Sequence, residues 1–386
     1  MSSTADVVIV GGAAVGSAVA YFLGRGGYKG RVTVVEKDPT YQWCATGRSL
    51  ASLRQQFSTE ENIRLSRFGI ELVKGIKAEF GAEADVGFRE FGYLMMASPD
   101  GRATLERNIR LQLSLGADTE LLEPAEIARR FPWLCVDGVA AAGWGRTGEG
   151  CVDPHALMNL FKSSARGATY LADEVVGVSH AAGRVTGVRL KSGGTFACGA
   201  LVNAAGWHSA KIAAMAGLEL PVRPRKRQIF VIDCPTPLPG CGLMIDPTGV
   251  FFRPEGRYYV AGVSPRPEND PDTESFDIDH DEFERDVWPV LATRAPALET
   301  LKVVNAWACH YDYNTLDQNA ILGPHPRLSN FYFASGFSGH GLQQSPAVGR
   351  AIAELLIHGR YTTIELSRFG YARVAANAPL PELNVI

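Results

Sequence analysis

A glycine-rich turn near the start of the chain has the residue types and spacing needed to hold a phosphate group. Gly11, Ala13 and Gly16 follow the apolar run Val7–Val10. Small residues let the backbone approach a pyrophosphate, and the unpaired N–H groups of a new helix favour its negative charge. Glu36 stands about 20 residues further on, a distance at which a carboxylate reaches a ribose hydroxyl. The spacing predicts a dinucleotide with an unphosphorylated ribose, FAD or NAD rather than NADP.

Three local elements must position these residues. The β-branched runs Val7–Val10 and Arg31–Val35 predict parallel strands, and the periodic apolar segment Ser17–Leu23 predicts the helix between them. The motif alone is a weak signal, because an ordinary strand-to-helix turn has similar residues and Ala13 replaces the middle glycine of the usual pattern. Lys37 follows the acidic residue directly and is assigned to the same predicted site.

Small residues also end two later predicted strands. The buried strand expected at Ala200–Gly206 ends in Ala205 and Gly206, and the strand at Phe331–Ala334 leads into the loop Ser335–Gly341 and a helix. At the edge of a parallel sheet, such endings let a ligand approach the backbone. The loop lacks the Gly-x-Ser-x-Gly spacing of a serine-hydrolase nucleophile, so its helix N-terminus is expected to face an electron-rich ligand.

A polar segment after the first unit could contact the same ligand. The stretch 47–49 precedes a helix predicted at 59–80 and suits either a phosphate or flavin contact or a plain helix cap. Between the two, Arg54 and Gln56 lie among apolar neighbours. They face either a ligand or the solvent.

The most basic stretch of the chain has four cations between Arg223 and Arg227, ahead of a strand predicted at 229–232. Such a cluster is most simply a solvated face. The alternative is that Arg227 points into a cavity, where its planar fork binds a carboxylate. His310 and Tyr311 lie in a stretch dense in aromatic and polar groups, and they are either ligand contacts or packed structural residues.

The composition of the 386 residues excludes several classes of function. The formal net charge is −3, with 20% charged and 46% hydrophobic residues, so neither a nucleic-acid partner nor disorder is expected. Seven cysteines occur without a CxxC pair, which predicts a reducing compartment and no metal site. Glycines interrupt the first apolar run, so no membrane span or signal peptide is expected. We predict a cytoplasmic protein, with a mature organellar form as the alternative.

Three segments taken together carry a resemblance over essentially the whole chain. The first strand and turn with Glu36, the segment 201–206 and the segment 336–341, in this order, resemble the D-amino-acid oxidase and sarcosine oxidase superfamily of FAD enzymes. The stretches 307–319 and 323–326 resemble most closely the FAD-dependent oxidoreductase domain-containing proteins, one of which assists respiratory complex I assembly. The three segments together are far more specific than any one of them.

The resemblance implies an α/β (α+β) fold, with a Rossmann-like FAD-binding domain and a second domain that holds the substrate on a mixed or antiparallel β-sheet. The FAD-binding domain would comprise residues 1–85, 150–222 and 318–386, and the substrate domain residues 86–149 and 223–317. The change to short β-rich runs after the first of these segments favours the same division. The flavin would lie between the domains.

The resemblance also implies which residues hold FAD. The cofactor-binding residues expected are Gly11, Ala13, Gly16, Glu36, Lys37, Gly47, Arg48, Ser49, Val175, Ala205, Gly206, Gly339, His340, Gly341 and Leu342. Non-covalent binding is expected. The alternative is a covalent bond through Cys309, because sarcosine oxidases attach their flavin through a cysteine at about this place.

The reaction implied is oxidation of the C–N bond of a secondary or tertiary amino acid, such as an N-methylglycine, an opine or an iminodiacetate-like compound. Hydride passes to flavin N5, and water hydrolyses the imine that forms. The substrate-side residues expected are Arg54, Gln56, Arg227, Arg253, His310, Tyr311, His340 and Gln343. The arginines are candidates to bind the substrate carboxylate. Gln343 stands where sarcosine oxidases carry a carboxylate-binding lysine, which argues against sarcosine itself.

Two alternatives stand beside the amine oxidoreductase. One is a flavin-bearing assembly factor or scaffold for a respiratory complex with little catalysis. The other, an NAD-dependent dehydrogenase, leaves the third glycine-rich segment without a role. The partners expected are a small-molecule amino acid, oxygen or a quinone or other electron-transfer acceptor, and a partner subunit.

Overall fold

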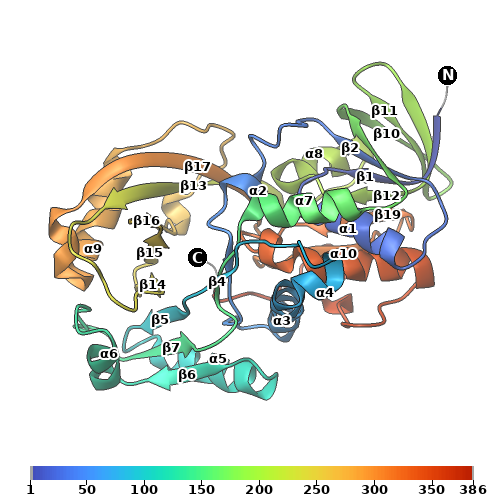
Figure 1. Cartoon of the computed structure of the whole chain (residues 1–386). Helices are drawn as coiled ribbons and strands as arrows, with labels where there is room; N and C mark the ends of the chain where they lie inside the picture. The colour runs from blue at the N-terminus through green and yellow to red at the C-terminus, as the bar shows by residue number, and fades with distance from the viewer. Residues whose placement is uncertain (1–2, 385–386) are drawn as a thin grey trace.

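The computed structural model describes residues 3–384, which form two large β-sheets, one small sheet and the helices that cover them. Figure 1 shows two lobes, one containing β1, β2 and β12 with α1, α7 and α10, the other containing β13 to β17 with β5 to β7. Within the described range, no helix combines the length and the apolar character needed to cross a membrane.

The first sheet has a parallel core. Its central strand β1 (Ser3–Val10) lies between β2 (Val32–Glu36) and β12 (Thr195–Asn203), and all three run in the same direction. Its other strands are β9 (Ala168–Ala172), β10 (Val175–Ala181), β11 (Arg184–Leu190), β18 (Ile321–Pro324) and β19 (Phe331–Ser335). The carboxyl ends of the parallel strands meet at one edge, which is where open α/β sheets bind ligands.

Helices cover both faces of this sheet. Because side chains alternate along β1, Val7 and Ile9 face one core while Val8 and Val10 face the other. The helices of the first face are α1 (Ala14–Arg25), α3 (Glu60–Lys74), α7 (Pro154–Ser164) and α10 (Gly341–His358), and α8 (Ser209–Met215) covers the second. Shorter helices are α2 (Ala45–Arg48), α4 (Ile76–Phe80) and α11 (Ala372–Ala375). This arrangement confirms the predicted Rossmann-like layer structure.

The second sheet is mixed and mainly antiparallel. Its order is β17 (Lys302–Asn314), β13 (Val222–Asp233), β16 (Tyr258–Val263), β15 (Val250–Glu255), β14 (Leu243–Ile245), β5 (Tyr93–Ala97), β7 (Ala141–Gly145) and β6 (Thr119–Leu122). Only the β14–β5 pair is parallel. The helices of this lobe are α5 (Arg102–Ser114), α6 (Pro124–Arg130) and α9 (Trp288–Arg294). The mixed second sheet agrees with the predicted fold class.

A small sheet joins the two lobes, formed by β3 (Ser52–Leu53), β8 (Gly150–Cys151) and β4 (Arg89–Glu90). Each large sheet takes its strands from one side of the predicted domain division, apart from Val222 at the start of β13. The division itself stays a prediction. Residues 1–2 and 385–386 of its ranges lie outside the described residues.

Two elements differ from their predicted extent, and one helix starts irregularly. The helix expected at 59–80 breaks at Gly75, between α3 and α4, because glycine is a poor interior residue and a common helix end. Ahead of α9 the chain forms a π-helical turn, Phe283–Val287; Pro289 cannot donate the N–H that would continue an α-helical ladder. The basic cluster expected ahead of the strand at 229–232 lies inside β13.

Candidate cofactor and substrate site

A cavity lies at the carboxyl edge of the first sheet, where β1, β2 and β12 end. Residues of all the predicted segments line it: Gly11, Ala13, Glu36, Lys37, Ser49, Val175, Ala205, Gly206, Gly339, Gly341 and Leu342. On the side of the second sheet it is bounded by His310, Tyr311 and Asp312 of β17. The cavity therefore lies where the two large sheets meet.

The backbone around the first turn fixes the carboxylate of Glu36. The N–H of Gly12 donates to one oxygen at 2.7 Å, and the N–H of Asp38 donates to the other at 2.8 Å. Gly11 has φ 98°, and a Cβ there would lie 2.4 Å from the carbonyl oxygen of Ala204. The N-cap residue of helix α1 provides no side-chain cap, and the N–H of Ala14 donates to Oγ1 of Thr46 at 3.4 Å. The positive end of the helix dipole favours an anion at this position.

Asp312 holds the glycine loop that precedes α10. One of its carboxylate oxygens accepts from the N–H of Gly336 at 2.7 Å and from that of Phe337 at 3.1 Å. Gly339 has φ 99°, and a Cβ there would lie 2.6 Å from the ring of Tyr311. Burial raises the pKa of Asp312 to about 6. The loop is thus locked between β17 and α10, with its backbone against the cavity.

Arg54 is a buried cation without an acidic partner. Its side chain is 2% exposed, donates to the carbonyl of Gln56 and to Nε2 of His340, and lies 3.9 Å from the ring centroid of Phe57. Burial and the neighbouring Arg54 lower the pKa of His340 well below its usual value, so its neutral ring can accept this bond. Between residues 3 and 384, no carboxylate is within ion-pair distance of Arg54. Burying a charge is costly without a counterion, which favours an anionic ligand here.

The other two candidate arginines are neutralised by acids of their own chain. Arg227 makes a two-pronged ion pair with Asp270 at 2.8 and 2.9 Å, and both side chains are buried. Arg253 pairs with Glu255 and donates to the carbonyl of Leu50 at 2.8 Å. Arg227 also lies 5.0 Å from the ring centroid of Tyr311, so it contacts the cavity wall from behind.

Comparison with known proteins identifies the family of the chain and the cofactor of that family. Residues 6–355 match the family described as FAD dependent oxidoreductase. The chain belongs to this family of FAD-dependent oxidoreductases. It is 41% identical to FAD-dependent oxidoreductase domain-containing protein 1 of Xenopus laevis, over 99% of this chain and 85% of that protein. It is 28% identical to sarcosine oxidase subunit beta of Rhizobium meliloti, over 92% and 85% of the two chains.

A solved structure supports the assignment of the fold. The L-proline dehydrogenase of P. horikoshii superposes with a TM-score of 0.87 and 29% sequence identity, over 98% of this chain and all of that one. The expectation of an FAD enzyme of the amino-acid oxidase superfamily is therefore confirmed, together with the cofactor. The NAD-dependent alternative is set aside by the same matches.

The residues present fit FAD. The Glu36 carboxylate, held by two backbone N–H groups, stands where a ribose would bind, and the start of α1 suits the pyrophosphate. At Gly206, with φ 56°, a Cβ would meet nothing within 4 Å, so the backbone is open to the cavity. Four predicted cofactor residues are not part of the lining: Gly16, Gly47, Arg48 and His340. The roles of all the predicted cofactor residues toward FAD stay predictions.

His310 and Cys309 show how the wall on β17 is built. His310 is 1% exposed, its ring packs between those of Trp207 and Phe276, and neither ring nitrogen has a hydrogen-bond partner among the described residues. Burial lowers the pKa of His310, which keeps the ring neutral. Cys309 also lines the cavity, and burial raises the pKa of its thiol to about 11. Both side chains can therefore contact a ligand in their uncharged forms.

Sequence reasoning missed several polar residues of the site. His208 lines the cavity, with its Nε2 2.7 Å from Nζ of Lys37; it lies two residues after the strand ending predicted at Ala200–Gly206, which could have indicated it. Glu149 is fully buried and accepts from the side chain of Gln56 at 2.9 Å. Burial raises its pKa to about 7. No local pattern marks Glu149, because it is brought to Gln56 by the pairing of β8 with β3.

Proposed function

We propose that the protein oxidises a secondary or tertiary amino acid at the carbon next to its nitrogen, with FAD as the hydride acceptor. Arg54 carries the proposal: it is buried without an acidic partner in the described chain and contacts His340, whose neighbours Gly339 and Gly341 line the cavity. A guanidinium binds a carboxylate through two charge-assisted hydrogen bonds. The substrate is therefore expected to carry a carboxylate.

The similar proteins favour a nitrogen that carries more than one carbon. Sarcosine oxidase subunit beta and L-proline dehydrogenase are both named for amino acids with a secondary nitrogen. In this chain Gln343 uses its Oε1 to accept the backbone N–H of Arg54 at 2.9 Å and adds no cation. We infer that the substrate carboxylate depends on Arg54 alone.

FAD supplies the hydride acceptor when it is bound, and the chain supplies position and electrostatics. Arg54 would bind the substrate carboxylate, and neutral His340 would hold the guanidinium in place by accepting a hydrogen bond from it. Helix α10 starts at Gly341 and has 18 residues, so its first N–H groups favour negative charge in the cavity beside them. Water then hydrolyses the imine to a carbonyl compound and a smaller amine.

Anaerobic bleaching of the visible flavin absorbance tests this function. Sarcosine, N,N-dimethylglycine, iminodiacetate and proline are the probes, and pyrrolidine, which is proline without its carboxylate, is the matched control. We expect at least one of the amino acids to bleach the flavin and pyrrolidine to leave it oxidised. Reoxidation by oxygen and by a soluble quinone then identifies the acceptor. A flavin that no amine reduces would instead favour the assembly or scaffold role.

A further inference from the structure

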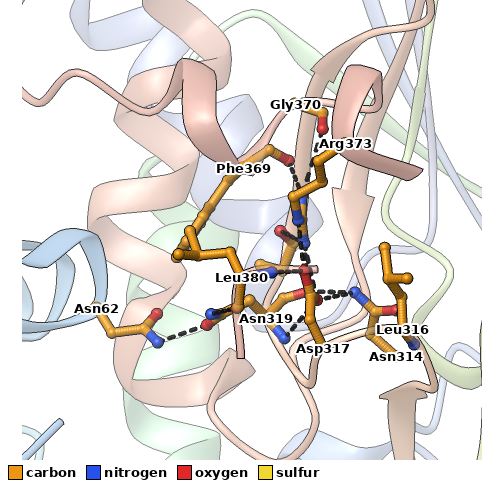
Figure 2. Close-up of polar contacts among 10 residues, drawn as sticks. Asn62, Asn314, Leu316, Asp317, Asn319, Phe369, Gly370, Arg373 and Leu380 are labelled. Atoms are coloured by element: carbon orange, nitrogen blue, oxygen red, sulfur yellow. Dashed lines mark hydrogen bonds and ion pairs between the residues drawn. The ribbon is translucent and has the colours of Figure 1, made fainter. Parts of the chain in front are cut away.

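The segment Leu380–Asn384 leads from a buried polar cluster to Arg54. Figure 2 shows this cluster around Asp317 and Arg373, which form an ion pair of 2.7 Å. Leu380 is fixed at both of its backbone groups, since its N–H donates to Asp317 at 3.0 Å and its carbonyl accepts from Asn319 at 2.7 Å. The start of the segment is therefore anchored.

Glu382 gives the segment a second anchor. Its carboxylate is 2% exposed and accepts from the backbone N–H and hydroxyl groups of both Ser58 and Thr59, at 2.7 to 3.2 Å. The side chain of Asn62 donates to it as well, at 2.9 Å. These donors surround the N-terminus of α3, where a negative charge is favourable. The segment is therefore fixed by hydrogen bonds at Glu382 as well as at Leu380.

Beyond Glu382 the segment turns to the predicted substrate anchor. The backbone carbonyl of Asn384 accepts from Nη2 of Arg54, and its side-chain amide donates to the carbonyl of Gln56 at 3.1 Å. Leu383 between them is 54% exposed. Asn384 thus makes a neutral contact with the cation that lacks an acidic partner.

We propose that Asn384 is a latch that occupies the carboxylate site at Arg54 until the substrate displaces it. The proposal rests on the function proposed above and adds how the substrate is selected. Nη2 of Arg54 has two N–H groups. One donates a hydrogen bond to His340 and the other to the carbonyl of Asn384. A carboxylate that uses both terminal nitrogens of Arg54 must therefore remove the carbonyl of Asn384.

The charges decide this competition. A hydrogen bond between a guanidinium and a carboxylate is about twice as strong as one between neutral groups, whereas the latch offers only a neutral carbonyl. The movement can be confined to the residues after Glu382, which keeps its own bonds. It works against the bond from the N–H of Leu383 to Oγ of Ser58 at 2.8 Å, the bond from the N–H of Asn384 to Glu382 at 3.0 Å, and the bond from Asn108 to the side chain of Asn384 at 3.4 Å. An amine without a carboxylate has no negative charge with which to displace the carbonyl of Asn384 from Arg54. The latch consequently selects amino acids against simple amines.

Two variants test the latch, with Leu383→Ala as the matched control. The first variant ends at Glu382, which removes the latch and keeps its anchor. The second is Asn384→Gly, which removes the side-chain bonds to Gln56 and from Asn108 and leaves the backbone carbonyl in a looser segment. The probe is 2-furoate, a flat carboxylate without an amine, titrated against the flavin spectrum of the holoenzyme. Its neutral amide, 2-furamide, shows whether the change depends on charge.

We expect the variant that ends at Glu382 to bind 2-furoate more tightly, by about tenfold if the latch is closed nine-tenths of the time. Asn384→Gly should shift the same way by less, and Leu383→Ala and 2-furamide should show no such gain. With an amino acid that reduces the flavin, KM should fall and kcat stay the same. Unchanged or weaker binding of 2-furoate in both latch variants, with binding that still needs Arg54, overturns the latch alone. Binding that does not need Arg54 overturns both the latch and the proposed substrate anchor.

Discussion

Arg54 and Arg227 are both buried close to the cavity, but of the two only Arg227 forms an ion pair with an acidic side chain among residues 3–384. Asp270 meets both terminal nitrogens of Arg227, whereas Arg54 has only a carbonyl, an imidazole and a backbone latch around it. A paired guanidinium is a structural element, because a ligand would have to break the pair first. For the unpaired guanidinium of Arg54, we propose that an anionic ligand takes the place of the missing acid. Residue type and burial therefore do not identify a ligand-binding arginine; its counterion does.

The largest expected effect is the loss of folding stability when the ion pair between Arg227 and Asp270 is broken. Arg227→Gln leaves the buried carboxylate of Asp270 without its partner, which should lower the free energy of unfolding by about 3–5 kcal/mol. Urea denaturation measures this change in the free energy of unfolding. The double variant Arg227→Gln/Asp270→Asn removes both charges and should regain most of the loss. Equal stability of the single variant and the wild type would remove the distinction between the two arginines.

Arg54→Gln should act on binding instead of folding. Loss of a buried charge-assisted pair costs about 2 kcal/mol or more, so the dissociation constant of 2-furoate should rise at least about 30-fold. Flavin absorbance titrated with 2-furoate gives this value. For an amino acid that reduces the flavin, the loss should appear in KM more than in kcat, since the carboxylate is bound before and during the reaction.

The double variant Arg227→Gln/Asp270→Asn is the matched control for Arg54→Gln, because it also removes one buried guanidinium. Its affinity for 2-furoate should stay within about threefold of the wild type, a difference well below 1 kcal/mol. A loss of affinity as large as that of Arg54→Gln would place the carboxylate at Arg227.

The sequence could predict the parts of this site that are formed by residues close together in the chain. The first turn and Glu36 are local in sequence, and the cavity lining at Gly11, Gly206 and Gly339 was expected from strand endings. The partner of Arg227 could not be predicted, since Asp270 is 43 residues away in a segment with several other acids.

The segment near the end of the described chain could not be placed either. The contact between Asn384 and Arg54 spans 330 residues and depends on how Glu382 docks on α3. Local patterns indicate a strand, a turn or a helix start. They do not indicate which distant group satisfies a buried charge, and that choice decides the roles of Arg54 and Arg227.

Glu149 extends the comparison to a buried acid without an arginine. Its pKa is raised by burial to about 7, so between about pH 4.5, the usual value, and pH 7 the folded protein keeps a proton that the unfolded chain has lost. Stability from this group is complete below that window and is lost as the pH rises through it. Glu149→Gln stays uncharged, and the unpartnered Oε1 of Gln56 can accept from the new amide when Gln56 turns. The variant should therefore gain stability relative to the wild type between pH 5 and pH 8.

Thermal denaturation at these two pH values measures the gain, and Glu83→Gln, at an exposed position, is the control that should show none. Were the difference between Glu149→Gln and the wild type the same at both pH values, Glu149 would be ionised throughout and its buried charge would be compensated by Arg54. That result would make Arg54 a paired arginine like Arg227.

The smallest effect is expected at Cys309, which stands opposite Arg227 in the pairing of β13 with β17. A thiol forms a bond to flavin as the thiolate, and a nearby cation that is free to stabilise it would lower its pKa. Arg227 already forms an ion pair with Asp270. Burial of the Cys309 thiol outweighs the effect of the Arg227 charge, so the pKa of Cys309 is raised to about 11 and the thiol stays protonated. We therefore expect acid precipitation to release all the yellow colour into the supernatant, in the wild type and in Cys309→Ala alike. Colour kept in the wild-type pellet and lost from that of Cys309→Ala would show a covalent bond, and would mean that the charge of Arg227 reaches the cavity in spite of its partner.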